Sequence, residues 1–205
     1  MPKKAIVLLA DGFEEVEALT PIDYLRRAGV EVTTVSIKAG PAVTGAHNIQ
    51  LNADTTLGEL VKQGKAGAAS WDASSSFDAV VLPGGMPGAS NLAASGETGA
   101  LIKEMAAAGK WVCAICAAPA VVLAPLGLLS GKKFTCYPGT EEKVKDGKWS
   151  EDRVVIDGAN ARGDDARGGI ITSRGAGTAG EFAVAIIGKL VGEAEGSKVA
   201  QSVLL

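Results

Sequence analysis

The segment Lys110–Pro119 (KWVCAICAAP) contains the residue best suited to covalent chemistry, Cys116. An apolar run ends at this cysteine, small residues follow it, and a proline stands where the first turn of a helix is expected. A nucleophile on a sharp strand-to-helix turn has this layout, and a helix N-terminus behind it favours thiolate over thiol. We therefore expect Cys116 to be the reactive nucleophile; a buried structural cysteine is the alternative.

The other two cysteines are less suited to chemistry. Cys113 and Cys116 form a C-x-x-C motif, but Cys113 lies inside the expected strand. Three positions along a strand place two side chains on opposite faces, which disfavours a dithiol redox pair. Cys136 is expected in the core or at a dimer surface. Because His47 is the only histidine, neither a zinc site nor a Cys–His triad is expected.

Acidic residues follow the first expected strand in the segment Asp11–Glu17 (DGFEEVE). The helix macrodipole favours such residues in a first turn, so a purely structural role is one interpretation. The functional interpretation is that one carboxyl points toward the thiol. In an apolar pocket beside a thiolate its pKa would rise, and the protonated carboxyl would donate a hydrogen bond to sulfur and move a proton during catalysis.

Glycines close another expected strand in the segment Leu82–Gly88 (LPGGMPG). The backbone N–H groups of Gly84 and Gly85, with that of Ala117, are candidates for an oxyanion hole and substrate contacts. An ordinary Pro-Gly turn is the alternative. The segment is not a G-x-G-x-x-G motif, which disfavours a dinucleotide. We expect no cofactor and no metal.

Short apolar runs that alternate with helical patterns are expected to position these residues. The expected strands are Ala5–Leu9, Glu31–Ile37, Asn48–Leu51, Ala79–Leu82, Trp111–Ile115, Lys133–Cys136, Arg153–Ile156 and Gly169–Thr172. The expected helices are Phe13–Ala28, Thr56–Gln63, Thr98–Ala108, Ala117–Leu126, Thr178–Val191 and Gly196–Val203. Strands without polar alternation are typical of parallel sheets covered on both faces. The pattern predicts one α/β domain over residues 1–205, a flavodoxin-like doubly wound sheet with helices on both faces. Lys65–Ser76 is expected to be a surface loop, and Asp157–Gly169 the turn of a β-hairpin.

The composition narrows the class of protein further. The 205 residues include 20 basic and 23 acidic side chains, and no basic cluster matches a phosphate backbone, so nucleic acid is a poor candidate partner. No stretch approaches the ~20 apolar residues needed to cross a bilayer, and the first apolar run is too short for an export signal. Together with the odd number of cysteines, this favours a reducing cytoplasm.

In combination these segments resemble the DJ-one/ThiJ/PfpI family, in particular its DJ-one branch. The motifs D-G-x-E-E-x-E, L-R-R-A-G, V-V-L-P-G-G, A-I-C-A-x-P and S-R-G-x-G-T occur in the family's order across nearly the whole chain. The resemblance implies a flavodoxin-like homodimer without metal or nucleotide. It also implies that Cys116 is the reactive cysteine, that Glu17 is the carboxylic acid bonded to it, and that Gly85 and Ala117 supply oxyanion-hole amides.

Two functions follow from this resemblance. One is a cofactor-free glyoxalase or deglycase that acts on 2-oxoaldehydes such as methylglyoxal and glyoxal. The other is a stress sensor or chaperone that works through oxidation of Cys116. Animal members of the branch have a histidine where this chain has Tyr137, so proton transfer is expected to use Glu17, water or Tyr137. The peptidase branch has a histidine directly after its cysteine, where this chain has Ala117, which disfavours a peptidase or amidotransferase.

Overall fold

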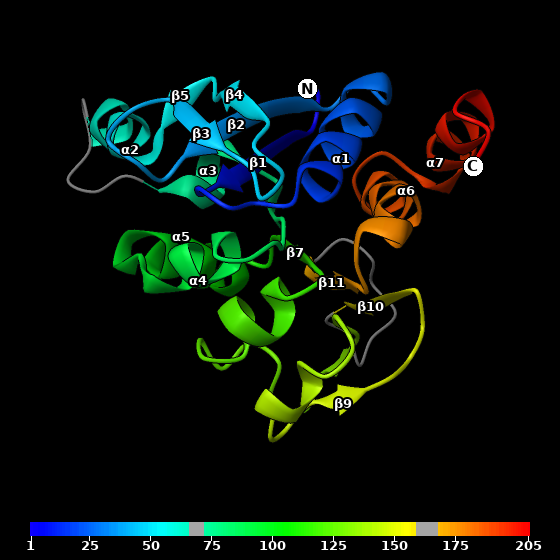
Figure 1. Ribbon diagram of the computed structural model, residues 1–205. Coiled ribbons are helices and arrows are strands. Elements are labelled where there is room, and N and C mark those ends of the chain that lie inside the picture. Colours follow the sequence, from blue (N-terminus) through cyan, green and yellow to red (C-terminus); the bar gives the residue numbers. More distant parts are fainter. Residues whose placement is uncertain (66–71, 159–167) are drawn as a thin grey trace.

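A seven-stranded sheet forms the centre of the computed structural model, which describes residues 1–65, 72–158 and 168–205 (Figure 1). The strands are β1 (Lys4–Leu9), β2 (Glu31–Ser36), β5 (Thr55–Thr56), β6 (Ala79–Leu82), β7 (Trp111–Ile115), β10 (Val154–Gly158) and β11 (Gly169–Ser173). Their spatial order is β10-β11-β7-β6-β1-β2-β5. All neighbours pair in parallel except β10, which runs antiparallel to β11 at the edge. The order β2-β1-β6-β7-β11 confirms the flavodoxin-like doubly wound sheet.

The central strands form where the sequence places uninterrupted apolar runs. Every residue of β6 and β7 is buried, and so is every residue of β1 after Lys4. A strand with this pattern has helices over both faces, since neither set of alternating side chains reaches water. The observed bounds of β6 and β7 equal the expected ones, and β1 and β11 each differ by one residue.

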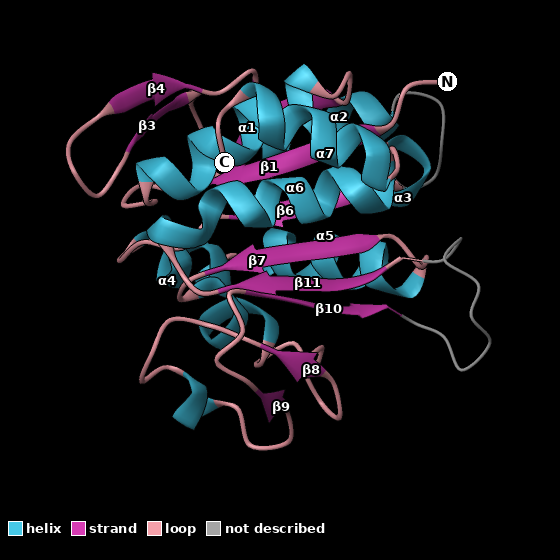
Figure 2. Cartoon of the chain, turned by 90° about the vertical axis from the view of Figure 1, so that its right-hand side faces the viewer, coloured by secondary structure: helices cyan, strands magenta, loops and turns pink. Residues whose placement is uncertain are grey.

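Helices cover both faces of the sheet (Figures 1 and 2). One apolar cluster joins the sheet to α1 (Glu15–Arg27), α6 (Ala179–Leu190) and α7 (Glu193–Ser202). The other cluster includes residues of α2 (Leu57–Lys65), α3 (Ala73–Ser76), α4 (Gly88–Ala94), α5 (Gly96–Ala107) and η1 (Pro119–Leu123). None of the described helices is both long and apolar enough to cross a membrane.

The remaining elements lie outside the main sheet. An antiparallel hairpin pairs β3 (Ala42–Thr44) with β4 (Gln50–Asn52), and β8 (Lys133–Phe134) pairs with β9 (Lys148–Trp149). Two short 3-10 turns are η2 (Glu141–Lys143) and η3 (Ala176–Thr178).

Several expected elements differ from the structure. The helix expected over Ala117–Leu126 is only the π-helical turn η1, although Pro119 does occupy its first position. The expected loop Lys65–Ser76 ends in the short helix α3, because the Asp72 side chain accepts hydrogen bonds from two backbone N–H groups of that turn. Residues 66–71 of that loop lie outside the described residues. The expected hairpin turn is bounded by antiparallel β10 and β11, but its residues 159–167 also lie outside the described residues.

Candidate active site

Cys116 directly follows β7, at the carboxyl edge of the sheet. Its φ is 62°, in the left-handed region that non-glycine residues seldom adopt. Its backbone N–H donates to the Ser173 carbonyl at 2.9 Å, and its carbonyl accepts from the Tyr137 N–H at 2.8 Å. These bonds to two other segments hold a backbone conformation that costs energy when free. The cysteine therefore sits on a sharp turn after a strand, as the sequence predicts.

The side chains of Glu17 and Cys116 both lie against Gly84. Glu17 is only 1% exposed, and its Oε2 accepts a hydrogen bond from the Gly84 N–H at 2.9 Å. A Cβ on Gly84 would lie 2.7 Å from both the Cys116 Cβ and the Glu17 Oε2. Only a residue without a side chain allows the carboxyl and the cysteine to approach this closely.

Backbone N–H groups surround the two side chains. Those of Gly85 and Ala117 lower the pKa of the Cys116 thiol, and that of Ala176 lowers the pKa of the Glu17 carboxyl, so each is close enough to stabilise the charged form. Gly85 has a φ of +84°, and a Cβ there would collide with the backbone of Glu14. The structure thus brings together Cys116, Glu17, Gly84, Gly85 and Ala117, the residues that the sequence analysis selected from three separate segments.

Burial raises the pKa of Glu17 from 4.5 to about 7. The hydrogen bonds from Cys116 and Gly84 act against this rise, while the charge of Glu14 adds to it. The direction is the one expected from the sequence. A carboxyl with a pKa near neutrality can both release and accept a proton under ordinary conditions, which is what a general acid–base catalyst requires.

The pKa of Cys116 rises as well, to about 12, which corrects the sequence-based expectation of a favoured thiolate. Burial is the largest cause, and the charge of Glu17 and its hydrogen bond to the thiol follow. The N–H groups of Gly85 and Ala117 oppose the rise. The expectation relied on a helix dipole, but η1 has only five residues and supplies little of it. With Glu17 ionised, the pair keeps its remaining proton on sulfur, and the carboxylate is placed to accept it.

The neighbouring acidic residues have other partners. Asp11 Oδ2 forms an ion pair with Lys38 at 2.6 Å, and Oδ1 accepts from the Thr44 N–H at 2.9 Å. Glu15 holds the turn between β3 and β4 through the backbone N–H and ring of His47. The choice of Glu17 rested on the resemblance, since residue type alone does not separate it from these neighbours.

Tyr137 lines an open pocket of about 480 Å³, and Gly175, which lies beside Glu17, lines the same pocket. A Cβ on Gly175 would lie 3.5 Å from the Tyr137 ring and 3.8 Å from Glu17 Oε1, so Gly175 separates the two. Arg153 and Arg174 also line this pocket. The sequence analysis missed Gly175 and Ala176 as neighbours of Glu17. The S-R-G-x-G-T motif was the available signal, because it follows a strand at the same sheet edge.

The other cysteines are removed from solvent. Cys113 and Cys136 are both 0% exposed, and burial raises the pKa of each thiol. Cys113 packs in the core formed with α1 and α6, as expected for a residue inside a strand. Neither thiol is accessible for a dithiol reaction in this conformation.

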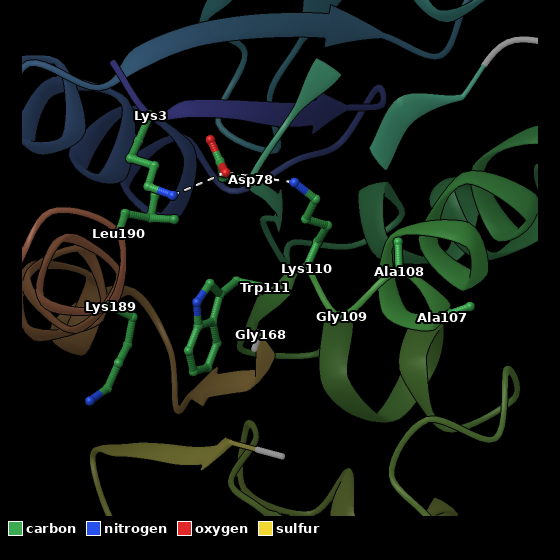
Figure 3. Close-up of a pocket in the computed structure, with 10 residues that line it drawn as sticks. All are labelled: Lys3, Asp78, Ala107, Ala108, Gly109, Lys110, Trp111, Gly168, Lys189 and Leu190. Atoms are coloured by element: carbon green, nitrogen blue, oxygen red, sulfur yellow. Dashed lines mark hydrogen bonds and ion pairs between the residues drawn. The ribbon is translucent and has the colours of Figure 1, made fainter. Parts of the chain in front are cut away.

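A cavity of about 600 Å³ lies at the opposite end of the sheet, where the parallel strands begin (Figure 3). Asp78, which precedes β6, forms ion pairs there with Lys3 at 3.3 Å and Lys110 at 3.6 Å. The Trp111 indole forms part of the wall. This cavity contains none of the predicted site residues, whereas the pocket beside Tyr137 adjoins them.

Comparison with known proteins decides the family. The model of the DJ-1/PfpI family matches residues 3–189. The chain belongs to the DJ-1/PfpI family. Protein dj-1beta of Drosophila melanogaster is 37% identical over 206 residues, covering 100% of this chain and 98% of that protein. A protein of Pyrococcus abyssi that is named a deglycase is 31% identical over 157 residues, covering 76% of this chain and 86% of that protein.

Solved structures of DJ-1/PfpI proteins have the same fold. The crystal structure of Drosophila melanogaster DJ-1beta superposes with a TM-score of 0.85 at 38% identity, over 100% of this chain and 99% of that one. The structure of oxidized Toxoplasma gondii DJ-1 has a TM-score of 0.84 at 33% identity, covering 98% of each chain.

We predict that Gly84→Ala disrupts the contact between Cys116 and Glu17, because the added Cβ overlaps both residues. The free energy of unfolding should fall by about 1–3 kcal/mol, as in other overpacked sites. Alkylation of Cys116 by iodoacetamide should change in rate. Gly58→Ala is the matched control, since a Cβ there meets nothing within 4 Å. Equal stability and alkylation in both variants would contradict the predicted contact.

The raised pKa of Glu17 predicts a pH dependence of stability. The folded protein holds this proton up to a pH of about 7, whereas the unfolded chain releases it near 4.5. Protonated Glu17 therefore contributes on the order of 3 kcal/mol to the free energy of unfolding. This contribution is full below about pH 4.5 and is lost as the pH rises to about 7. Denaturant unfolding of wild type and Glu17→Gln at several pH values isolates this contribution. A difference between the two proteins that stays constant over this window contradicts the raised pKa.

Proposed function

We propose that this protein converts 2-oxoaldehydes such as methylglyoxal and glyoxal into 2-hydroxy acids without a cofactor. The observation that carries the proposal is the buried carboxyl of Glu17, with a pKa of about 7, beside Cys116. Of the three cysteines, Cys116 alone is partly exposed, and the other two are buried. The deglycase name of the Pyrococcus abyssi relative supports chemistry on adducts that such aldehydes form with thiols and amines.

The reaction begins with addition of the Cys116 sulfur to the aldehyde carbon. The Glu17 carboxylate accepts the thiol proton and passes it to the aldehyde oxygen, which gives a hemithioacetal and restores the carboxylate. The raised pKa of the thiol makes this general-base step necessary, because little free thiolate is present at neutral pH. The N–H groups of Gly85 and Ala117 are the proposed donors to the developing oxyanion.

Glu17 then removes the hydrogen on the attacked carbon as a proton, and the electron pair left behind forms an enediolate with the neighbouring carbonyl. Glu17 returns that proton to the neighbouring carbon, and the proton of the hemithioacetal hydroxyl moves to the neighbouring oxygen. The attacked carbon thereby becomes a thioester, and the neighbouring carbonyl becomes a hydroxyl. Water hydrolyses the thioester and releases the 2-hydroxy acid and the thiol. The net change is addition of one water, and no external oxidant or reductant is needed.

A redox-sensing role is the second candidate, because the N–H groups of Gly85 and Ala117 and the Glu17 carboxyl are also suited to bind oxygen atoms on sulfur. Peroxide would transfer one oxygen to Cys116 in each of two steps, releasing water each time and leaving a sulfinate. Oxidation requires the thiolate, as the addition to an aldehyde does, so it too depends on removal of the thiol proton by Glu17. The deglycase name of the Pyrococcus abyssi relative favours the enzyme over the sensor.

We also propose that the protein is a homodimer. Apolar side chains are exposed on adjoining elements, namely Val16 and Leu19 on α1 and Ile49 beside β4, at 48%, 43% and 53% exposure. Such a patch suits an interface between two copies. Light scattering of the wild type should give twice the mass of one chain, and Leu19→Glu should lower the measured mass toward that of one chain. A mass of one chain for the wild type would contradict the proposal.

The catalytic proposal predicts different effects for three variants incubated with methylglyoxal without glutathione. Glu17→Gln keeps the size of the side chain but loses the proton carrier, so lactate formation should fall on the order of 10²-fold or more. Cys116→Ser should form none. Asp23→Asn, which changes an exposed carboxylate on the same helix, should match the wild type.

Two results would contradict the enzymatic role. One is near-wild-type turnover by Glu17→Gln, which would move the proton carrier elsewhere, with Tyr137 as the next candidate. The other is an absence of lactate from the wild type together with rapid formation of Cys116 sulfinate in peroxide. That second outcome would favour the redox sensor.

A further inference from the structure

Three potential metal ligands that the proposed reaction does not use meet beside α1. Glu14 and Glu15 stand at the start of this helix, and His47 lies in the turn between β3 and β4. His47 Nδ1 is 2.9 Å from Glu15 Oε2 and 3.6 Å from Glu14 Oε1. One ligand atom from each residue lies within 4.8 Å of the other two. Among the described parts of the chain, this is the one such group of three.

The turn that carries His47 is fixed against Glu15. Glu15 Oε1 accepts the backbone N–H of His47 at 2.8 Å and that of Ile49 at 3.4 Å. The Ala46 N–H also donates to the Phe13 carbonyl at 2.8 Å. One oxygen of Glu15 therefore holds the turn while the other faces the imidazole. The Glu15 side chain is only 5% exposed, so its position is set before any ion arrives.

We propose that Glu14, Glu15 and His47 bind a divalent transition-metal ion such as Zn²⁺, with water in the remaining positions. Zinc bonds to imidazole nitrogen and carboxylate oxygen are about 2.0–2.2 Å long, so ligand atoms around one ion lie roughly 3.3 Å apart. The separations of 2.9 and 3.6 Å bracket this value. The ion takes the place of the hydrogen that His47 and Glu15 share.

The donor set selects the class of ion. An imidazole with carboxylates suits Zn²⁺, Ni²⁺ or Cu²⁺, whereas Ca²⁺ and Mg²⁺ prefer oxygen ligands alone. Two carboxylates neutralise the charge of a divalent ion. The His47 side chain is 68% exposed in the single chain, so the ring can adjust its direction.

This inference stands apart from the proposed function. No step of the 2-oxoaldehyde reaction passes through the ion, and the ligands of the proposed site are not the reacting groups. The sequence contains no metal motif here because His47 and Glu15 are 32 residues apart. The hairpin of β3 and β4 creates the group of ligands.

Titration with Zn²⁺ tests the site, because His47 is the only histidine in the chain. The experiment uses Cys116→Ser, which removes the accessible thiol as a competing ligand, and combines calorimetry with NMR of the imidazole ring. We expect one Zn²⁺ per chain, and we expect the ring resonances to shift until that same ratio is reached. His47→Gln in this background should abolish binding.

Two further variants test the carboxylates. Glu14→Gln should weaken Zn²⁺ binding on the order of 10-fold or more, and so should Glu15→Gln. Glu14→Gln matters most, since Glu15 also holds the turn and its loss affects local structure. Asp23→Asn is the control and should bind as tightly as its parent. Unmoved ring resonances, equal binding by His47→Gln, or binding only when Cys116 is present would each overturn the proposal.

Discussion

A proton shared between the buried Glu17 carboxyl and the partly exposed Cys116 thiol is the interaction on which the rest of the candidate site depends. Burial raises the pKa of Glu17 to about 7 and that of Cys116 to about 12. Neither group ionises easily alone, because both charged forms lose their hydration. Together they hold one proton over a wide pH range, and the carboxylate is adjacent to the thiol that must lose it.

The backbone around the two residues is shaped so that Glu17 and Cys116 can touch. Gly84 leaves room for the carboxyl and the cysteine, and its N–H fixes one carboxyl oxygen. The left-handed backbone at Cys116 is held by hydrogen bonds to Ser173 and Tyr137, which belong to two other segments of the chain. β1, β6 and β7 are parallel neighbours, so their carboxyl ends lie at the same end of the sheet. The segments that carry Glu17, Gly84 and Cys116 follow these strands and therefore meet there. The rigid, fully buried strands thus offset local strain at the nucleophile.

Much of this arrangement was predictable from the sequence, for identifiable reasons. Ala79–Leu82 and Trp111–Ile115 were located correctly because strands buried on both faces leave an uninterrupted apolar signature. The sharp turn at Cys116 was predicted because a strand followed by small residues and a proline is a local pattern, and the left-handed φ of Cys116 confirms the turn. The choice of Glu17 came from the family resemblance, and the structure adds its contact with Gly84.

The features that the sequence did not predict depend on contacts between segments far apart in the chain. The pKa of Cys116 was expected to fall, because a full helix was expected after it; the sequence does not reveal that the helix shortens to η1 and that burial dominates. The contact between His47 and Glu15 also has no local signature, since it forms only when the β3–β4 hairpin folds over α1. Electrostatic environment is a property of tertiary packing, and residue spacing predicts it poorly.

The most direct test of this account is an NMR titration of the Glu17 side-chain carboxyl, labelled with carbon-13, in the folded protein. The shared-proton account predicts a midpoint near pH 7 that moves in Cys116→Ser, because replacing the sulfur changes the partner of that proton. A midpoint near 4.5, the ordinary value for a glutamate, that does not change in Cys116→Ser would contradict it.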